Sequence, residues 1–378
     1  MHCQYFADDL CRSCAWLAKP YADQLTAKQH HLASLIDLDG VIVEPPMASS
    51  PAGFRNKAKM GAFAVYGKPA LGIVNHRGMP IDLTDCPLYP PDMQQLLHGV
   101  ASWLGRTGID IYDVERRRGE LKFVLVTRSH AHADFMVRLV CRSEAPLAAL
   151  RRHLPDLLAV WPSIKVVSLN IQPVHMAVLE GEREILLTDA DAIADVFNGI
   201  AVQLPPGAFL QTNPAIASAL YQTASEWVAP LQPDSVQDLF CGVGLFGLTC
   251  APPGAELSGI ETSACAVAAA RQAASAAGID ATFVVGDAVA DLGCQSPGKP
   301  SLVIVNPPRR GLGSALCAQL RDLAPPYLLY SSCNAKTLAD DLALLVEYRL
   351  QRVRLFDMFP HTAHYETLAL LKYQPGAA

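Results

Sequence analysis

The sequence contains no long hydrophobic run and no excess of positive charge. Hydrophobic residues make up 51% of the 378 positions, but many of them are alanine, and no apolar stretch approaches the roughly 20 residues that cross a membrane. The formal net charge of −6 argues against indiscriminate binding to nucleic acids. We therefore expect a soluble protein that does not associate with membranes.

An export signal is also missing. The first residues, "MHCQYFADDLCRSC", lack a basic start, an apolar stretch and a small-residue cleavage site. We therefore expect a cytoplasmic protein, in which the 11 cysteines are thiols or metal ligands before they are disulfides. The length predicts two or three domains. We expect a monomer without an obligate protein partner.

Positive charge is concentrated in one part of the chain. Residues 51–152 contain 15 lysines and arginines against 9 aspartates and glutamates, so this stretch carries +6 and the rest −12. One cluster contains Arg55, Lys57 and Lys59, and two more lie within residues 115–122 and 150–154. Each cluster alone is most simply a solvated face. Together they predict a surface that contacts the phosphates of RNA.

Three segments follow one another along the chain. Residues 1–90 hold few periodic segments, many prolines and glycines and four cysteines, which predicts a small loop-rich unit that needs a staple. Residues 91–204 alternate strand-like runs with a helix near residues 146–160, which predicts a central α+β domain with an antiparallel sheet that faces RNA. Residues 205–378 alternate strands, glycine turns and helices, which predicts a mostly parallel, doubly wound sheet.

A glycine turn in the third segment is a candidate cofactor site. In "DLFCGVGLFG", Gly242 and Gly244 begin a G-x-G-x-x-G pattern between a strand and a helix, which alone indicates only a tight turn and a close approach to its backbone. Glu261 ends the next strand, where an acid can bind ribose hydroxyls. NAD and S-adenosylmethionine both fit. Asp238 beside the turn favours the cationic methionine group over a pyrophosphate.

The next two strand ends favour S-adenosylmethionine further. Asp287 follows one strand, where it could meet an adenine amino group. "NPPR" follows the other, from Asn306 to Arg309, and resembles the fourth motif of S-adenosylmethionine-dependent nucleic-acid methyltransferases. The two prolines stiffen this loop and hold the asparagine toward a target base. A dehydrogenase has no use for such a loop.

A thiol stands at the end of another buried strand, "YLLYSS". Cys333 follows it and precedes an expected helix, whose N-terminus should depress the thiol's pKa. Methylating carbon 5 of a pyrimidine requires a thiolate that adds to carbon 6 and a base that removes the carbon 5 proton. Most other cysteines are expected to be inert core residues, namely Cys141, Cys250, Cys265, Cys294 and Cys317.

The last motif, "FDMFPHTAHYETL", contains His361, His364 and Glu366 before a final strand. These three side chains could form a metal site, but no fixed helix supports it and a fourth ligand is not apparent. A base at the edge of the strand is the favoured interpretation of Glu366.

These motifs together resemble the RNA (uracil-C5)-methyltransferase family, and the likeness extends over nearly the whole chain. It implies a class I S-adenosylmethionine-dependent methyltransferase fold, Rossmann-like, with an N-terminal iron–sulfur unit and an α+β central domain. It also implies Cys333 as nucleophile, Glu366 as proton acceptor and 5-methyluridine as product. Uridine 747 of 23S ribosomal RNA is the substrate of the most similar members. The implied cofactor-binding positions are Gln211, Phe240, Glu261 and Asn306, and Arg309 and Gln211 are candidates to hold the base.

Four further cysteines form a C-x7-C-x2-C set with a distant fourth member. Spacing alone is compatible with zinc, a redox disulfide or an iron–sulfur cluster, and it favours zinc. The clustered-then-distant pattern looks more like a [4Fe-4S] site, and the family resemblance implies the same. Such a cluster would staple the first segment. The four residues are Cys3, Cys11, Cys14 and Cys86.

Three alternatives remain open from the sequence. The same chemistry could act on another uridine of 23S ribosomal RNA or of transfer RNA. An iron–sulfur oxidoreductase could use the glycine turn for NAD, although "NPPRRG" and Cys333 would then have no role. A non-catalytic RNA-binding iron–sulfur protein would not depend on Cys333.

Overall fold

A computed structural model describes residues 1–65, 67–175, 178–292, 298–374 and 376. The chain forms two compact units. The first comprises Met1–Cys14 and Ser50–Asp195, and the second comprises Ala15–Ser49 and Val196–Ala378. Residues 1–90 therefore contribute to both units. No helix in the described ranges is long and apolar enough to cross a membrane.

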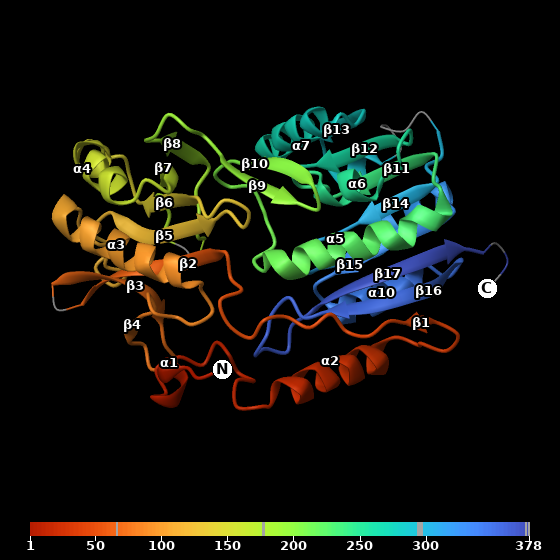
Figure 1. Ribbon diagram of the computed structural model, residues 1–378, viewed down its shortest axis with the longest axis horizontal. Helices are drawn as coiled ribbons and strands as arrows, with labels where there is room; N and C mark the ends of the chain where they lie inside the picture. Colours follow the sequence, from red (N-terminus) through yellow and green to blue (C-terminus); the bar gives the residue numbers. More distant parts are fainter. Residues whose placement is uncertain (66, 176–177, 293–297, 375, 377–378) are drawn as a thin grey trace. The chain divides into compact units, whose positions relative to one another are not determined.

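The first unit is built on a seven-stranded sheet with the order β4-β3-β2-β5-β6-β7-β8 (Figure 1). Its helices are α1 (Gln4–Ala7), α3 (Pro91–Thr107) and α4 (Leu147–Val160). The strands are β2 (Lys57–Val65), β3 (Lys68–Val74), β4 (Pro80–Asp82), β5 (Leu121–Arg128), β6 (Phe135–Cys141), β7 (Ile164–Ile171) and β8 (Arg183–Leu186).

Two expectations for this unit were wrong. Residues 57–82 form three strands rather than loops, because Ala58, Met60 and Ala62 alternate inward although alanine and glycine have low strand propensity. The sheet is also not wholly antiparallel, since β6 and β7 pair in parallel. The chain passes between them through α4, and such a crossover connection produces parallel neighbours.

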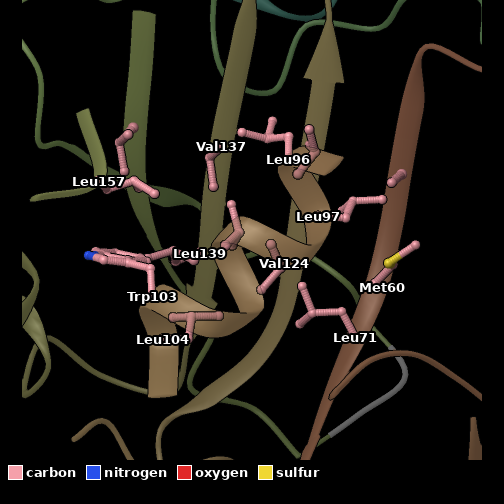
Figure 2. Close-up of a cluster of buried hydrophobic side chains, with 14 of the residues drawn as sticks. Met60, Leu71, Leu96, Leu97, Trp103, Leu104, Val124, Val137, Leu139 and Leu157 are labelled. Atoms are coloured by element: carbon pink, nitrogen blue, oxygen red, sulfur yellow. The ribbon is translucent and has the colours of Figure 1, made fainter. Parts of the chain in front are cut away.

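Helix α3 supplies much of the core of the first unit. Figure 2 shows Leu96, Leu97 and Trp103 of α3 pointing into the same cluster as side chains from the strands. Trp103 is 1% exposed, and its indole N–H donates to the carbonyl of His153 in α4 at 2.8 Å. The helix has proline at its first position and ends before Gly108, whose φ is 69°, so both ends follow the usual signals.

The second unit is built on an eight-stranded sheet with the order β1-β16-β17-β15-β14-β11-β12-β13. Its helices are α2 (Tyr21–Leu35), α5 (Pro214–Val228), η1 (Ala229–Leu231), α6 (Leu245–Cys250), α7 (Ala264–Ala277), α8 (Ala288–Asp291), α9 (Gly313–Leu323) and α10 (Ala335–Leu344). The strands are β1 (Ile42–Val43), β11 (Ser235–Leu239), β12 (Glu256–Glu261), β13 (Ala281–Val285), β14 (Leu302–Val305), β15 (Tyr327–Ser332), β16 (Tyr348–Phe356) and β17 (Glu366–Tyr373). A hairpin of β9 (Ile193–Phe197) and β10 (Ile200–Leu204) lies where the chain passes between the units.

This sheet confirms the predicted doubly wound architecture. Strands β11 to β15 pair in parallel, and β17 is antiparallel to both of its neighbours. From β11 the strand order runs to β12 on one side and to β14 on the other. This reversal is a topological switch point, where α/β sheets bind ligands beyond the carboxyl ends of their strands. Because β17 is antiparallel, its first residue lies at that same edge.

Candidate active site

A cavity of about 510 Å³ lies in the second unit. It is lined by residues that follow β11, β12, β13, β14 and β15 and by the first residue of β17. Nine residues that the sequence nominated line it together: Gln211, Phe240, Gly242, Glu261, Asp287, Asn306, Arg309, Cys333 and Glu366.

Asp238 and Gly244 are not among the lining residues. The Asp238 carboxylate is 1% exposed and accepts a hydrogen bond from the Gly247 N–H at 2.9 Å, so it holds the first turn of α6. Burial raises its pKa to about 7. A Cβ on Gly244 would lie 3.0 Å from the ring of Phe283. Both residues thus shape the glycine turn from the side that faces away from the cavity.

The side of the glycine turn that lines the cavity suits a nucleoside cofactor. Glu261 accepts hydrogen bonds from the N–H groups of Gly242 at 3.2 Å and Ser263 at 2.9 Å, which fix its carboxylate at the end of β12. A Cβ on Gly242 would meet no described atom within 4 Å, so the backbone there faces open space. Phe240 has a left-handed φ of 64°, unusual for an aromatic residue.

Asp287 and Asn306 line the cavity from the two strands that flank this pair. Asp287 caps α8, since its Oδ1 accepts from the N–H groups of Val289 at 2.8 Å and Ala290 at 3.2 Å. The Asn306 side chain has no hydrogen-bond partner in the part of the chain that the structure describes, and it is half-buried. Its carboxamide is therefore available to a ligand.

The loops carrying Asn306 and Cys333 are tied together by hydrogen bonds. The side chain of Asn334 caps α10 by accepting from the Lys336 N–H at 3.2 Å. Its Nδ2 donates to the carbonyl of Arg309 at 3.0 Å, and the Thr337 hydroxyl donates to the same carbonyl at 3.3 Å. The thiol of Cys333 therefore lies on a fixed turn beside the "NPPR" loop.

The pKa of Cys333 is raised, which corrects the expectation of a depressed value. Burial is the largest cause, and the neighbouring Glu366 carboxylate raises it further. The Arg309 guanidinium lowers it by charge and by a hydrogen bond, but by less.

Glu366 is the most perturbed carboxyl in the cavity. It is 1% exposed, and burial raises its pKa to about 7. The Ser331 hydroxyl donates to its Oε1 at 2.7 Å, while its Oε2 is buried and unpartnered among the described residues. An unpaired buried oxygen costs free energy unless a proton or ligand satisfies it.

Two positions that hold the site were missed by the sequence reasoning. Asp341 accepts from the N–H groups of Leu312 at 2.8 Å and Gly313 at 3.1 Å and from the hydroxyl of Tyr330 at 2.6 Å, so it fixes the chain that follows "NPPR". Ser331 orients Glu366. The alternation of β15, which places Ser331 and Cys333 on the same side of the strand, was the available signal.

The other predictions for cysteine and histidine are confirmed only in part. Cys141, Cys250 and Cys317 are buried as expected, whereas Cys265 is exposed in the first turn of α7 and that expectation was wrong. Cys294 lies outside the described residues. His361 is buried and His364 exposed, and the described ranges contain no group of three or more His, Cys, Asp or Glu residues that could hold a metal ion.

Cys3, Cys11, Cys14 and Cys86 form no disulfide and are half-buried in the first unit. Burial raises the pKa of Cys14 to about 12, and Cys86, Cys11 and Cys3 raise it further by charge. The pKa of Cys86 is raised to about 11, by burial and then by Cys3 and Cys11. The four sulfur atoms therefore lie within electrostatic reach of one another. Arg55 opposes both shifts.

A larger hollow of about 890 Å³ lies in the first unit. Its lining includes Lys59, Phe63, Tyr112, Lys122 and His175, with no thiol. This hollow therefore lacks the nucleophile that the smaller cavity contains, and the smaller cavity is the candidate active site.

Comparison with known proteins identifies the family of the chain. Residues 298–374 match the model of the tRNA (Uracil-5-)-methyltransferase family, and residues 200–320 match the methyltransferase small domain. The chain is 49% identical over 372 residues to the 23S rRNA (uracil(747)-C(5))-methyltransferase RlmC of Serratia proteamaculans, covering 98% of this chain and 99% of that protein. It is 48% identical over 375 residues to the protein of the same name from Shewanella loihica, with the same coverage.

A solved structure shares the fold. The Pyrococcus abyssi tRNA (uracil-54, C5)-methyltransferase in complex with S-adenosyl-L-homocysteine superposes with a TM-score of 0.80, at 24% identity, over 96% of this chain and 84% of that one. The second unit thus has the α/β fold of S-adenosylmethionine-dependent methyltransferases. From the full-length identity to the curated relatives, this chain belongs to the RNA (uracil-C5)-methyltransferase family and is an enzyme of that class.

Proposed function

We propose that the chain methylates carbon 5 of one uridine in 23S ribosomal RNA, and that this uridine is the one numbered 747 in the names of its relatives. The observation that carries the proposal is the placement of Cys333, Glu366 and the loop of Asn306 in one cavity. A thiol, a carboxyl of raised pKa and an unpartnered amide are the groups that this reaction requires. The cytoplasm is where this RNA would be met.

The cofactor half of the cavity fits S-adenosylmethionine, which supplies a methyl group on a positively charged sulfur. Glu261, already fixed by Gly242 and Ser263, would accept hydrogen bonds from the ribose hydroxyls. Phe240 and Gln211 line the same space. Asn306 would meet the methionine end or the base, and Asp287 would meet the adenine amino group.

In the base half, Cys333 would begin the reaction as a thiolate. Its sulfur forms a bond to carbon 6 of the uracil, and the ring becomes an enolate whose carbon 5 takes the methyl group. The Arg309 guanidinium, which lowers the pKa of Cys333 and lines the same cavity, supports the thiolate and faces the base. The uracil must be unpaired or flipped out, because this addition needs access to the face of the ring.

Glu366 would complete the reaction. Its carboxylate removes the proton from carbon 5, the bond between sulfur and carbon 6 breaks, and the Cys333 thiolate leaves. A carboxyl whose pKa is about 7 both accepts and returns a proton near neutral pH. The unpartnered Oε2 of Glu366 is the oxygen free to take it, because Oε1 is bonded to Ser331.

The first unit would bind the RNA around the target. Lys57 is crowded by Lys59 and Arg138, and burial with these charges lowers its pKa to about 8. Lys59 lines the hollow together with Phe63 and other aromatic rings. Cations beside exposed rings suit phosphates and unpaired bases. The sequence predicts the same role, contact with RNA, for Arg55.

We propose a [4Fe-4S] cluster for Cys3, Cys11, Cys14 and Cys86, as a structural staple of the first unit. A single zinc ion needs its sulfur ligands about 2.3 Å away, whereas three clustered cysteines with a distant fourth are the pattern of four-thiolate cluster ligation. The ligands of a cluster bind separate irons and stand further apart. Cys3 and Cys11 raise the pKa of both Cys14 and Cys86 by charge, so bound iron would relieve the repulsion that ionised sulfur atoms would feel here. Anaerobically purified protein should be brown and contain iron, and colourless protein with stoichiometric zinc would overturn this assignment.

The decisive experiment uses a 23S fragment that contains 5-fluorouridine at the target. Fluorine cannot leave carbon 5 as a proton does, so a covalent RNA–protein complex should survive denaturation with S-adenosylmethionine present and be absent for Cys333→Ala. With natural RNA, Glu366→Gln should accumulate the same complex. Methylation without any complex would contradict the thiolate mechanism. NAD binding without S-adenosylmethionine binding would favour the oxidoreductase alternative.

A further inference from the structure

Helix α2 presents a polar face to the segment that precedes Glu366. Tyr21, Gln24, Lys28 and His31 recur at intervals of three and four, which places them on one side of a helix. Gln24 and Lys28 are 1% and 0% exposed. Buried polar groups cost free energy unless they are bonded, so their partners indicate the role of this face.

The strongest contact is an ion pair. Lys28 Nζ donates to Asp357 Oδ1 at 2.5 Å, and both side chains are 0% exposed. Lys28 also donates to the carbonyl of Phe359 at 3.1 Å, and the Tyr21 hydroxyl donates to Asp357 Oδ2 at 2.7 Å. Phe359 lines the active-site cavity. The ion pair therefore anchors the start of the segment that forms a cavity wall.

The middle of the segment is held in a strained conformation. His361 has a left-handed φ of 65°, which is rare for a residue other than glycine and persists only where its surroundings enforce it. Its N–H donates to Gln24 Oε1 at 2.9 Å, and its carbonyl accepts from the Trp16 N–H at 2.9 Å. Gln24 in turn donates to the carbonyls of Trp16 at 3.1 Å and Lys19 at 2.9 Å.

The end of the segment is held by the same helix. His31 Nδ1 and the Tyr365 hydroxyl are hydrogen bonded at 2.7 Å, and Tyr365 immediately precedes Glu366. Leu32 lies one turn beyond Lys28 on the same buried side of α2, and Leu32 and Ile36, which follows the helix, belong to the same hydrophobic core as Leu338 of α10. Figure 1 shows α2 alongside the C-terminal elements of this unit, and α2 contacts α10. Exchanging one polar group should thus leave the helix docked.

We propose that the polar face of α2 is a positioning brace that holds residues 357–365, and through them Phe359 and Glu366, beside the bound base. The proposal rests on the proposed function of Cys333 and Glu366. Cys333 lies on a different loop, held by Asn334 and Arg309. Weakening the brace should therefore slow proton removal by Glu366 more than the addition of Cys333 to the base.

The test compares Tyr365→Phe and Lys28→Met with His30→Phe, a control at an exposed neighbour that faces away from this contact. A labelled 23S fragment and S-adenosylmethionine are mixed with each protein for a single turnover. Covalent complex and released methylated RNA are then measured on a denaturing gel. We expect the ratio of complex to released product to rise about threefold or more in both brace variants, the size of effect that one hydrogen bond can have. His30→Phe should match the parent protein.

Glu366→Gln is run in parallel as the reference. If it accumulates complex and the brace variants keep the parent ratio, the brace is refuted and the proposed function stands. If complex and product fall together in the brace variants, the polar face of α2 has only a structural role, and the brace proposal is also refuted. If Glu366→Gln itself accumulates no complex, the assignment of Glu366 as the base fails. Lys28→Met leaves Asp357 buried without its cation and could prevent folding. Tyr365→Phe removes only one hydroxyl, so the test then rests on this variant.

Discussion

At the scale of single residues, the environment of the site disfavours negative charge on its two reactive groups, the Cys333 thiol and the Glu366 carboxyl. Burial raises the pKa of both Cys333 and Glu366, and the Glu366 carboxylate raises that of Cys333 further. Two acids that disfavour each other's ionisation titrate as a pair. The proposed reaction uses their charges in turn, because the negative charge of Cys333 passes to the base before Glu366 must accept a proton.

This coupling predicts the pH dependence of the reaction. The single-turnover rate with saturating RNA should rise with pH through about 7, where Glu366 loses its proton, and rise further as the Cys333 thiolate forms. In Glu366→Gln, complex formation should reach its plateau at lower pH than in the parent, because the carboxylate that raises the Cys333 pKa is gone. Quenched reactions between pH 6 and 9 measure both profiles. A parent rate that falls above pH 7 would contradict the assignment.

Asp238 makes a separate prediction about stability. Its pKa is about 7 in the fold and near 3.9 in an unfolded chain, so its stabilising contribution is complete below the unfolded value and is lost as pH rises through 7. Asp238→Asn carries no charge and keeps an oxygen for the Gly247 N–H. Its unfolding free energy relative to the parent should therefore increase between pH 5 and pH 8, by at most about 3 kcal/mol. Asp234→Asn, at an exposed position just before β11, should show no such trend in urea titrations.

At the scale of elements, the sequence predicted the strands that are marked by a hydrophobic run and missed elements that lack one. The buried runs of β14 and β15 and the residues after them were located correctly, because parallel strands are continuously apolar and carry their chemistry at one edge. The strand of Lys57–Val65 was missed since its inward residues are mostly alanines. Helix α2 was missed because two of its three buried residues are Gln24 and Lys28, and such a polar stripe is expected to be solvated until its partners are known.

The turn after β15 makes a prediction at this scale. Asn334 both caps α10 and ties the turn to the Arg309 carbonyl. Serine can replace the cap but not the amide that reaches Arg309. Asn334→Ala should lose about 1 kcal/mol of stability and also form the covalent complex more slowly. Asn334→Ser should recover the stability in thermal unfolding while complex formation stays slow, and recovery of both would show that only the cap matters.

At the scale of the whole molecule, charge and chemistry belong to different units. The thiol, the carboxyl and the cofactor cavity are all in the second unit, whereas the basic stretch of residues 51–152 is in the first. A net charge of −6 then allows an RNA enzyme that does not bind nucleic acid indiscriminately, because the positive charge is local. RNA affinity and chemical rate should consequently respond to different substitutions.

Lys59→Ala tests this separation. Lys59 is half-exposed in the hollow of the first unit, so its loss should remove one phosphate contact, weaken RNA binding and reduce the slope of log affinity against log salt by about 0.7. The methylation rate at saturating RNA should stay that of the parent. Lys68→Ala, an exposed lysine on β3 that does not line the hollow, is the matched control and should leave the slope unchanged. If both substitutions change the salt slope equally, the basic surface attracts RNA only by its general charge. If Lys59→Ala lowers the methylation rate at saturating RNA, the first unit also takes part in the chemical step.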